Sequence, residues 1–152
     1  MKLELKNIKH TSWASEETHC YQASLYVDGK PVAIVSNDGH GGADRDYSHP
    51  KFKGEYRDTM RKVNEYFKSL PNIPSEWFPE GMEQTLEFWC CDQVNDWLSE
   101  RELKSKLKKV FLFQFADKVG VFSHKTRPSP AHKAIILNDM PFEDALAIWK
   151  AT

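Results

Sequence analysis

The segment that decides the fold is residues 19–35, which read HCYQASLYVDGKPVAIV. Its first half alternates apolar and polar side chains, and this period of two predicts a strand over about residues 19–27. Asp28-Gly29 follows it. This pair is a strong hairpin signal, because a type I′ turn needs positive φ at both central positions. The apolar residues 32–35 then predict the returning strand, with Pro31 at its first residue or on an edge, because proline has no N–H to donate.

Sequence on both sides of this hairpin predicts an α+β fold. Leu3 and Leu5 indicate a strand that completes an N-terminal three-stranded meander. Apolar residues spaced by three and four predict helices over about 54–69 and 82–98. The pattern Ser99-x-x-Glu102 resembles a capping box and predicts a short third helix, and a last helix is expected from about Pro141.

Two further regions complete the predicted architecture. Residues 110–125 are expected to form a hairpin that joins the first sheet. Residues 135–137 predict a short strand or a helical turn. The proline-rich connector at 71–81 carries Trp77 and Phe78, whose rings are expected to pack it onto the domain. We therefore expect one domain over residues 1–152, with a mostly antiparallel sheet and three to four helices packed on it.

Composition favours a cytoplasmic globular protein. The chain has 152 residues, of which 40% are hydrophobic, with nine Phe and five Trp, enough for one packed core. No apolar run approaches the roughly 20 residues that span a bilayer, and the N-terminus does not resemble a signal peptide. Three cysteines (Cys20, Cys90 and Cys91) are an odd count with two adjacent, which argues against a disulfide framework.

Charge is unevenly distributed along the chain. Residues 1–100 contain 11 Lys or Arg and 17 Asp or Glu, whereas residues 101–133 contain nine Lys or Arg and two acidic residues. A basic segment of this kind could bind nucleic acid. The alternative, which we favour, is a solvated helix face together with lysines that protect strand edges from pairing.

The stretch Ser36–His49 is the sharpest candidate for function. It combines turn residues with no apolar periodicity, so it predicts a long loop, and long loops in small domains are often functional. Its glycines could let backbone N–H groups surround an anion. The hairpin would place Thr18 and His19 beside this loop. The expected ligand-binding residues are Thr18, His19, Ser36, Asn37, Asp38, Gly39, His40, Gly41, Gly42 and Asp44, with added charge from Lys125 and Arg127.

The same loop leaves a catalytic alternative open. Carboxylates and imidazoles are ligands for Zn, Mn or Fe, so a metal-dependent hydrolase is the second hypothesis. It would use Asp38, His40, Asp44, Asp46 and His49. Their spacing matches no established metal motif, and the glycines match neither a Walker loop nor a dinucleotide fingerprint. A simpler alternative is a polar loop whose Asp and Asn side chains cap their own turns.

Residues 15–30, SEETHCYQASLYVDGK, and residues 35–42, VSNDGHGG, resemble a group of small hypothetical proteins from bacteria and their phages. Those proteins carry a Glu-Thr-His-Cys strand and a Ser-Asn-x-Gly-x-Gly-Gly loop, and relatives often have Cys or another residue in place of Ala43. The resemblance implies a phage or mobile-element origin. Accessory proteins of that kind often bind a host factor or sequester a signalling nucleotide. It assigns no catalytic residue.

We therefore expect a non-enzymatic binding protein without a cofactor. Its partner would be a host protein or a small anionic ligand such as a nucleotide, held by the loop Ser36–Asp46. The metal-dependent hydrolase and a nucleic-acid-binding module formed by residues 101–133 are the alternatives.

Overall fold

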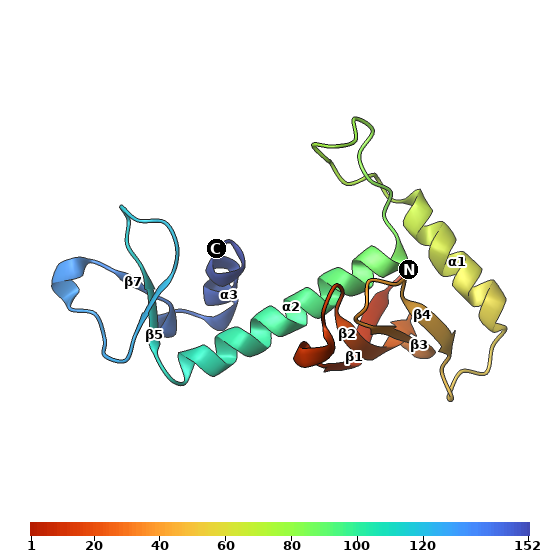
Figure 1. The fold of residues 1–152 in the computed structure, drawn as a ribbon, viewed down its shortest axis with the longest axis horizontal. Coiled ribbons are helices and arrows are strands. Elements are labelled where there is room, and N and C mark those ends of the chain that lie inside the picture. Colours follow the sequence, from red (N-terminus) through yellow and green to blue (C-terminus); the bar gives the residue numbers. More distant parts are fainter. The chain divides into compact units, whose positions relative to one another are not determined.

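The computed structural model describes all residues from Met1 to Thr152, and the chain divides into two compact units, Met1–Val94 and Asn95–Thr152. Each unit contains its own antiparallel sheet, one of four strands and one of three, and the chain has three α-helices. The predicted α+β class is confirmed (Figure 1). None of the helices is both long and apolar enough to cross a membrane.

The four-stranded sheet of the first unit has the order β1-β2-β3-β4. Its strands are β1 (Leu3–His10), β2 (Cys20–Val27), β3 (Lys30–Asp38) and β4 (Arg45–Ser48). The turn between β2 and β3 has φ of 49° at Asp28 and 82° at Gly29, as the sequence predicted. The register of this hairpin shifts between Leu25 and Tyr26, opposite Pro31.

Half of the expected loop Ser36–His49 is strand, which corrects the sequence analysis. β3 continues to Asp38, and Arg45–Ser48 returns along it as β4, with Ser36 paired to Arg45 and Ala33 to Ser48. Only residues 39–44 connect the two strands. All four side chains of β4 are exposed, so the strand has no hydrophobic alternation and left no signal in the sequence.

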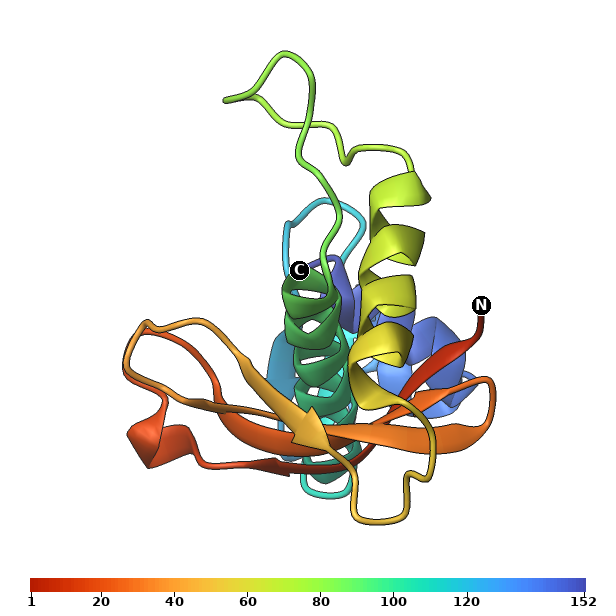
Figure 2. The ribbon, with the colours of Figure 1, turned by 90° about the vertical axis from the view of Figure 1, so that its right-hand side faces the viewer.

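Two helices cover one face of this sheet (Figures 1 and 2). α1 (Tyr56–Ser69) buries Val63 and Phe67, and its Phe67 ring lies 6.3 Å from that of Trp89 in α2 (Leu86–Leu107). The sheet contributes fully buried side chains such as Leu25 to the same core. The interface holds α1 and the start of α2 against β2 and β3.

The segment between α1 and α2 extends away from the sheet instead of packing on it (Figures 1 and 2). Trp77 is 86% exposed and Phe78 is 56% exposed. The expectation that these rings fasten the connector to the domain is therefore wrong. The connector is instead held by its own hydrogen bonds.

α2 runs without a break through Ser99 and Glu102, so the predicted separate third helix is wrong. The helix contains neither Gly nor Pro, and the capping-box pattern therefore falls inside it. α2 begins in the first unit and ends in the second.

The second unit has a three-stranded sheet of order β6-β5-β7. Its strands are β5 (Phe111–Gln114), β6 (Phe122–His124) and β7 (Ile135–Ile136), and α3 (Phe142–Lys150) follows. The C-terminal hairpin does not join the first sheet as expected, because β7 pairs with β5 and occupies its second edge. The core of the unit contains Leu103, Leu112, Leu137 and Ala145.

Candidate functional site

A pocket of about 200 Å³ opens in the first unit, where β2 begins, β3 ends and α2 begins. Residues from the turn before β2, from both strands, from the 39–44 connection and from α2 line it. They are Thr18, His19, Tyr21, Asn37, Asp44, Glu87, Phe88 and Cys91. Four of them, Thr18, His19, Asn37 and Asp44, are residues that the sequence singled out.

Asn37 organises the polar side of the pocket. Its side-chain oxygen accepts hydrogen bonds from Thr18 Oγ1 at 2.7 Å and from the Gly39 backbone N–H at 2.9 Å. Its side-chain amide donates to Gly42 O at 2.9 Å and to Asp44 Oδ1 at 3.0 Å. Asn37 is only 8% exposed, so this one side chain fixes both ends of the 39–44 connection with no buried polar atom left unsatisfied.

Asp44 is held at the same place by a second contact. Tyr21 Oη donates a hydrogen bond of 2.6 Å to Asp44 Oδ2. Burial raises the pKa of Asp44 and the nearby Glu87 raises it further, while the bonds from Tyr21 and Asn37 act in the opposite direction. Burial is also the main reason that the pKa of Tyr21 is raised. The ionised form of Asp44 is therefore less stable in the pocket than it would be in water.

Glu87 brings a second carboxylate to the pocket from the first turn of α2. Thr85 accepts the Phe88 N–H on its Oγ1 at 3.2 Å, which caps the helix at this end. Glu87 Oε1 accepts the backbone N–H of Asp44 at 3.0 Å. The first turn of α2 is thus hydrogen-bonded to the 39–44 connection, and Asp44 and Glu87 both line the same cavity. Glu87 had no signal in the sequence, because its role depends on the packing of α2 beside β3.

The anion nest expected from the glycines is not open to a ligand, because the N–H groups of residues 39–41 donate to side-chain oxygens of the protein. Three successive N–H groups, from Glu16, Glu17 and Thr18, point at one oxygen, the Gly39 carbonyl, at 3.2, 3.0 and 3.4 Å. Gly39 has φ of 87°, and a Cβ there would lie 2.0 Å from the Ala14 carbonyl oxygen. The protein's own carbonyl occupies this cluster of donors, and these bonds fix the 15–18 turn to the start of the 39–44 connection.

His19, which lines the pocket, is paired with His10. His10 Nε2 lies 3.1 Å from His19 Nδ1, and Ser15 Oγ lies 3.3 Å from the same His10 nitrogen. Burial and the neighbouring His19 lower the pKa of His10. A second cavity of about 520 Å³ adjoins, lined in part by both histidines, Glu17 and Cys91.

The two adjacent cysteines of α2 have different surroundings. Cys90 is 1% exposed, and burial and the charge of Asp44 raise its pKa to about 12. Cys91 is exposed and lines both cavities. Consecutive helical residues point about 100° apart, so only one of them can face the core. Cys20 lines neither cavity, consistent with neighbouring strand residues facing opposite ways.

The remaining predicted ligand residues lie outside the pocket. Ser36 is a paired residue of β3, Asp38 forms an exposed ion pair of 3.5 Å with Arg45, and His40 lies 3.3 Å from Glu16. Lys125 and Arg127 belong to the second unit. The guanidinium of Arg127 is bound to Asp139, with Nη2 at 2.9 Å from Oδ1.

The five residues of the hydrolase hypothesis bond to different partners. Asp46 accepts from Tyr56 Oη, and His49 Nδ1 accepts from the Lys51 N–H at 3.0 Å. Asp44 faces Tyr21 and Asn37 as described above. No three His, Cys, Asp or Glu side chains are grouped so that they could hold a metal ion.

Many basic side chains of the segment 101–133 contact aromatic rings of the second unit. Five of the nine lie over aromatic rings at 4.5 to 6.0 Å: Arg101, Lys104, Lys106, Lys118 and Arg127. Such cation–π contacts hold these side chains against rings of the second unit while leaving their charge in place. The observation favours the structural interpretation of the segment.

Comparison with known proteins gives no assignment: no family model, curated protein or solved structure matches this chain. The resemblance to small phage and bacterial proteins stays a prediction.

Proposed function

We propose that this chain is a non-enzymatic binding protein whose pocket, formed by the Asn37 network, Asp44, Glu87 and Phe88, receives a cationic group. The group would be a guanidinium or an ammonium. The observation that carries the proposal is the convergence of Asp44 and Glu87 on one cavity that has no Lys or Arg among its lining residues.

The electrostatics support a cation more than the anion expected from the sequence. A phosphate in this pocket would meet two carboxylates without a counter-charge. A guanidinium would instead neutralise them and could form paired N–H···O bonds, which suit its planar geometry. Phe88 is 45% exposed and adds an aromatic wall on which a cation can stack.

Several features support binding rather than turnover. Each Asp44 oxygen already accepts one protein hydrogen bond, and Asn37 holds the connection in place with four. Such a rigid acceptor set is suited to recognition, because little entropy is lost when the ligand arrives. A basic side chain on the surface of a host protein, the partner class that the resemblance implies, would supply the cation.

The exposed thiol of Cys91 gives a direct assay. A bulky maleimide should react first at Cys91, since Cys20 is less exposed and Cys90 is buried, with a raised pKa of about 12 that keeps it protonated. N-acetyl-arginine methylamide should slow this reaction, and calorimetry should give a saturable heat. An arginine-containing peptide that protects much better than the free derivative indicates a protein partner, and equal protection indicates a small cation.

The control ligands are citrate and ATP at the same ionic strength. Protection by the arginine derivative and not by these anions supports the proposal. Protection by ATP, or no protection by any cation up to tens of millimolar, contradicts it.

A further inference from the structure

The segment between α1 and α2 is an ordered hairpin-like projection, residues 70–85. Ile73 and Met82 exchange two backbone hydrogen bonds of 2.8 Å, and the Asn72 side chain donates to Glu80 O at 3.0 Å. Gln84 Nε2 closes the base by donating to Pro71 O at 2.8 Å. These bonds hold a fixed shape without help from the sheet.

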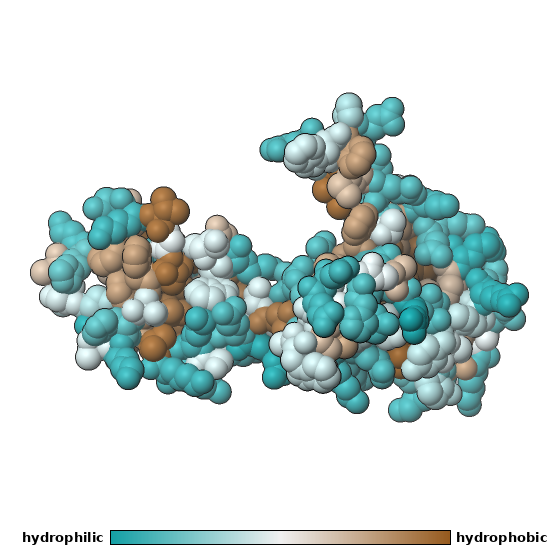
Figure 3. Space-filling model, in the orientation of Figure 1, coloured by the Kyte–Doolittle hydropathy of each residue, from teal (hydrophilic) through white to brown (hydrophobic).

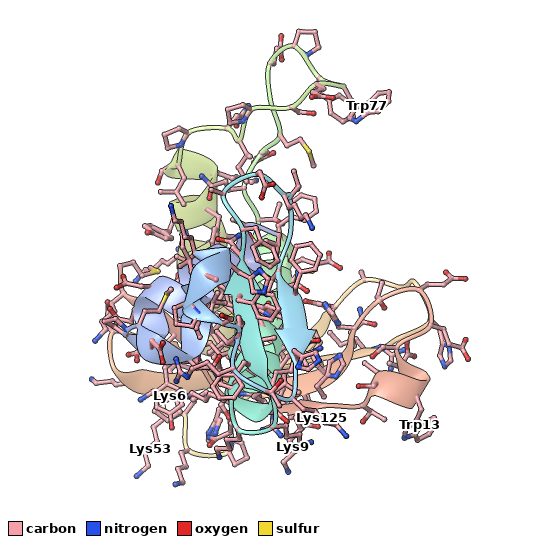
Figure 4. The ribbon with its side chains drawn as sticks, turned by 90° about the vertical axis from the view of Figure 1, so that its left-hand side faces the viewer. Lys6, Lys9, Trp13, Lys53, Trp77 and Lys125 are labelled. Carbon is pink, nitrogen blue, oxygen red and sulfur yellow. The ribbon has the colours of Figure 1, made fainter.

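The projection carries large apolar side chains into solvent. Trp77 lies near its tip and points away from the rest of the first unit (Figure 4), and Figure 3 shows hydrophobic side chains gathered along it. Ile73 is 43% exposed and Phe78 is 56% exposed. Clustered exposed aromatics on an ordered element are typical of an interaction site.

Negative charge surrounds the exposed rings of the projection and indicates the kind of surface that it would bind. From Ser69 to Glu100 the chain contains seven carboxylates and no Lys or Arg. On the projection itself the acidic residues are Glu76, Glu80 and Glu83. The complementary surface is therefore an apolar pocket with basic groups at its rim. An anionic membrane would be repelled.

The second unit presents a surface of that description. A pocket of about 290 Å³ is lined by Phe113, Phe115, His124, Thr126, Arg127, Pro128, Ser129 and His132. The exposed ring of Phe122 stacks on Phe113 at 6.2 Å, and Lys118 Nζ lies 5.2 Å from the Phe115 ring. Besides Lys118, the basic groups at this pocket are Arg127, which lines it and also pairs with Asp139, and Lys125, which stands between the lining residues His124 and Thr126 in the sequence.

We propose that the projection of one molecule binds the aromatic pocket in the second unit of another copy of this chain. Trp77 and Phe78 would contact the phenylalanine rings, and the three glutamates would face the basic rim. The contact joins two different surfaces. It therefore closes a dimer if it is reciprocal and extends into a chain of molecules if it is not.

Sedimentation equilibrium of the full chain tests this proposal. The wild type should rise above the monomer mass of 17.6 kDa with concentration, and more so at low salt. Trp77→Ala should weaken association at least about tenfold. Trp13→Ala is the matched control, because Trp13 is 88% exposed on a different part of the first unit (Figure 4).

A mixing experiment identifies the two halves of the contact. Trp77→Ala/Phe78→Ala removes the projection's side of it. Lys125→Glu/His132→Glu places negative charge at or beside the pocket rim, at exposed positions. Each variant alone should stay monomeric, whereas an equimolar mixture should form a complex through its one intact pair of surfaces. A monomeric wild type up to about 500 µM, an equal effect of Trp13→Ala, or a mixture that stays monomeric overturns the proposal.

Discussion

The Asn37 side-chain amide donates to Asp44 Oδ1 at 3.0 Å, and this contact joins the buried end of β3 to the carboxylate of the pocket. Asn37 also holds Thr18, Gly39 and Gly42, so the position of Asp44 depends on one side chain.

Asn37→Ala should destabilise the first unit by about 2–4 kcal/mol, because it leaves several polar groups in and around the pocket without a partner. Urea unfolding followed by tryptophan fluorescence measures this. Ser36→Ala is the neighbouring control, since no side-chain role for Ser36 is evident beyond its place in β3. A loss below about 0.5 kcal/mol for Asn37→Ala would show that the network does not hold the connection.

Asp44→Asn should weaken binding of the arginine derivative at least about tenfold. It should leave the melting temperature at pH 7 equal or higher. The folded-state pKa of Asp44 is raised, so the ionised form opposes folding, and its cost appears as pH rises through the usual value of 3.8 towards the folded pKa. The amide substitution removes that cost.

Asp38→Asn is the matched control for Asp44→Asn. Asp38 lies near the same connection but pairs with Arg45 at the surface and does not line the pocket. Its substitution should leave binding unchanged. Equal losses from the two variants would place the ligand on the outer loop and not in the pocket.

Gly39→Ala should destabilise the protein by more than about 2 kcal/mol, because the residue has positive φ and its Cβ would collide with the Ala14 carbonyl. Gly42→Ala should be nearly neutral, since a Cβ there meets no atom within 4 Å. Thermal unfolding of the two variants compares them directly. Similar melting temperatures would contradict the described path of the 15–18 turn over Gly39.

Stability should fall below pH 6.5 because of His10. Burial and His19 lower its folded-state pKa, so the unfolded chain takes up a proton first as pH falls from 6.5 towards the folded pKa; above 6.5 the contribution is constant. Melting temperatures measured from pH 5 to 8 should show this slope, and His10→Asn should reduce it. His132→Asn, on the exposed surface of the second unit, should not. If the melting temperature of His10→Asn still falls as steeply below pH 6.5, groups other than His10 cause the loss of stability.

The hairpin and α1 could be predicted because their signals are local. Asp28-Gly29 dictates its own turn, and the periodicity of α1 matches a core that is continuous along one face. β4 could not be predicted, because its side chains are all exposed and it pairs with β3 through backbone hydrogen bonds, which leave no pattern in the sequence. The prediction of a helix start at Ser99 was wrong, because residues on both sides of the capping-box pattern are helical and α2 continues through it. The expectation of a single domain stays a prediction.

The candidate site likewise contains residues that the sequence indicated and residues that it did not. Thr18, His19, Asn37 and Asp44 were found because the hairpin brings them together within one segment of sequence. Glu87, Phe88 and Cys91 come from a helix more than 40 residues later, and no pattern in the sequence links them to the loop. The Glu87 carboxylate is the reason that we propose a cationic ligand where the sequence led us to expect an anionic one.

The most direct measurement is an amide NMR titration of the full chain with N-acetyl-arginine methylamide, followed by the same titration with ATP. We predict saturable shifts at Thr18, Asp44, Glu87 and Cys91 with the arginine derivative, absent in Asp44→Asn, and none there with ATP. Saturable shifts with ATP at Ser36–Gly42, and none at Asp44 and Glu87 with the cation, would contradict the account.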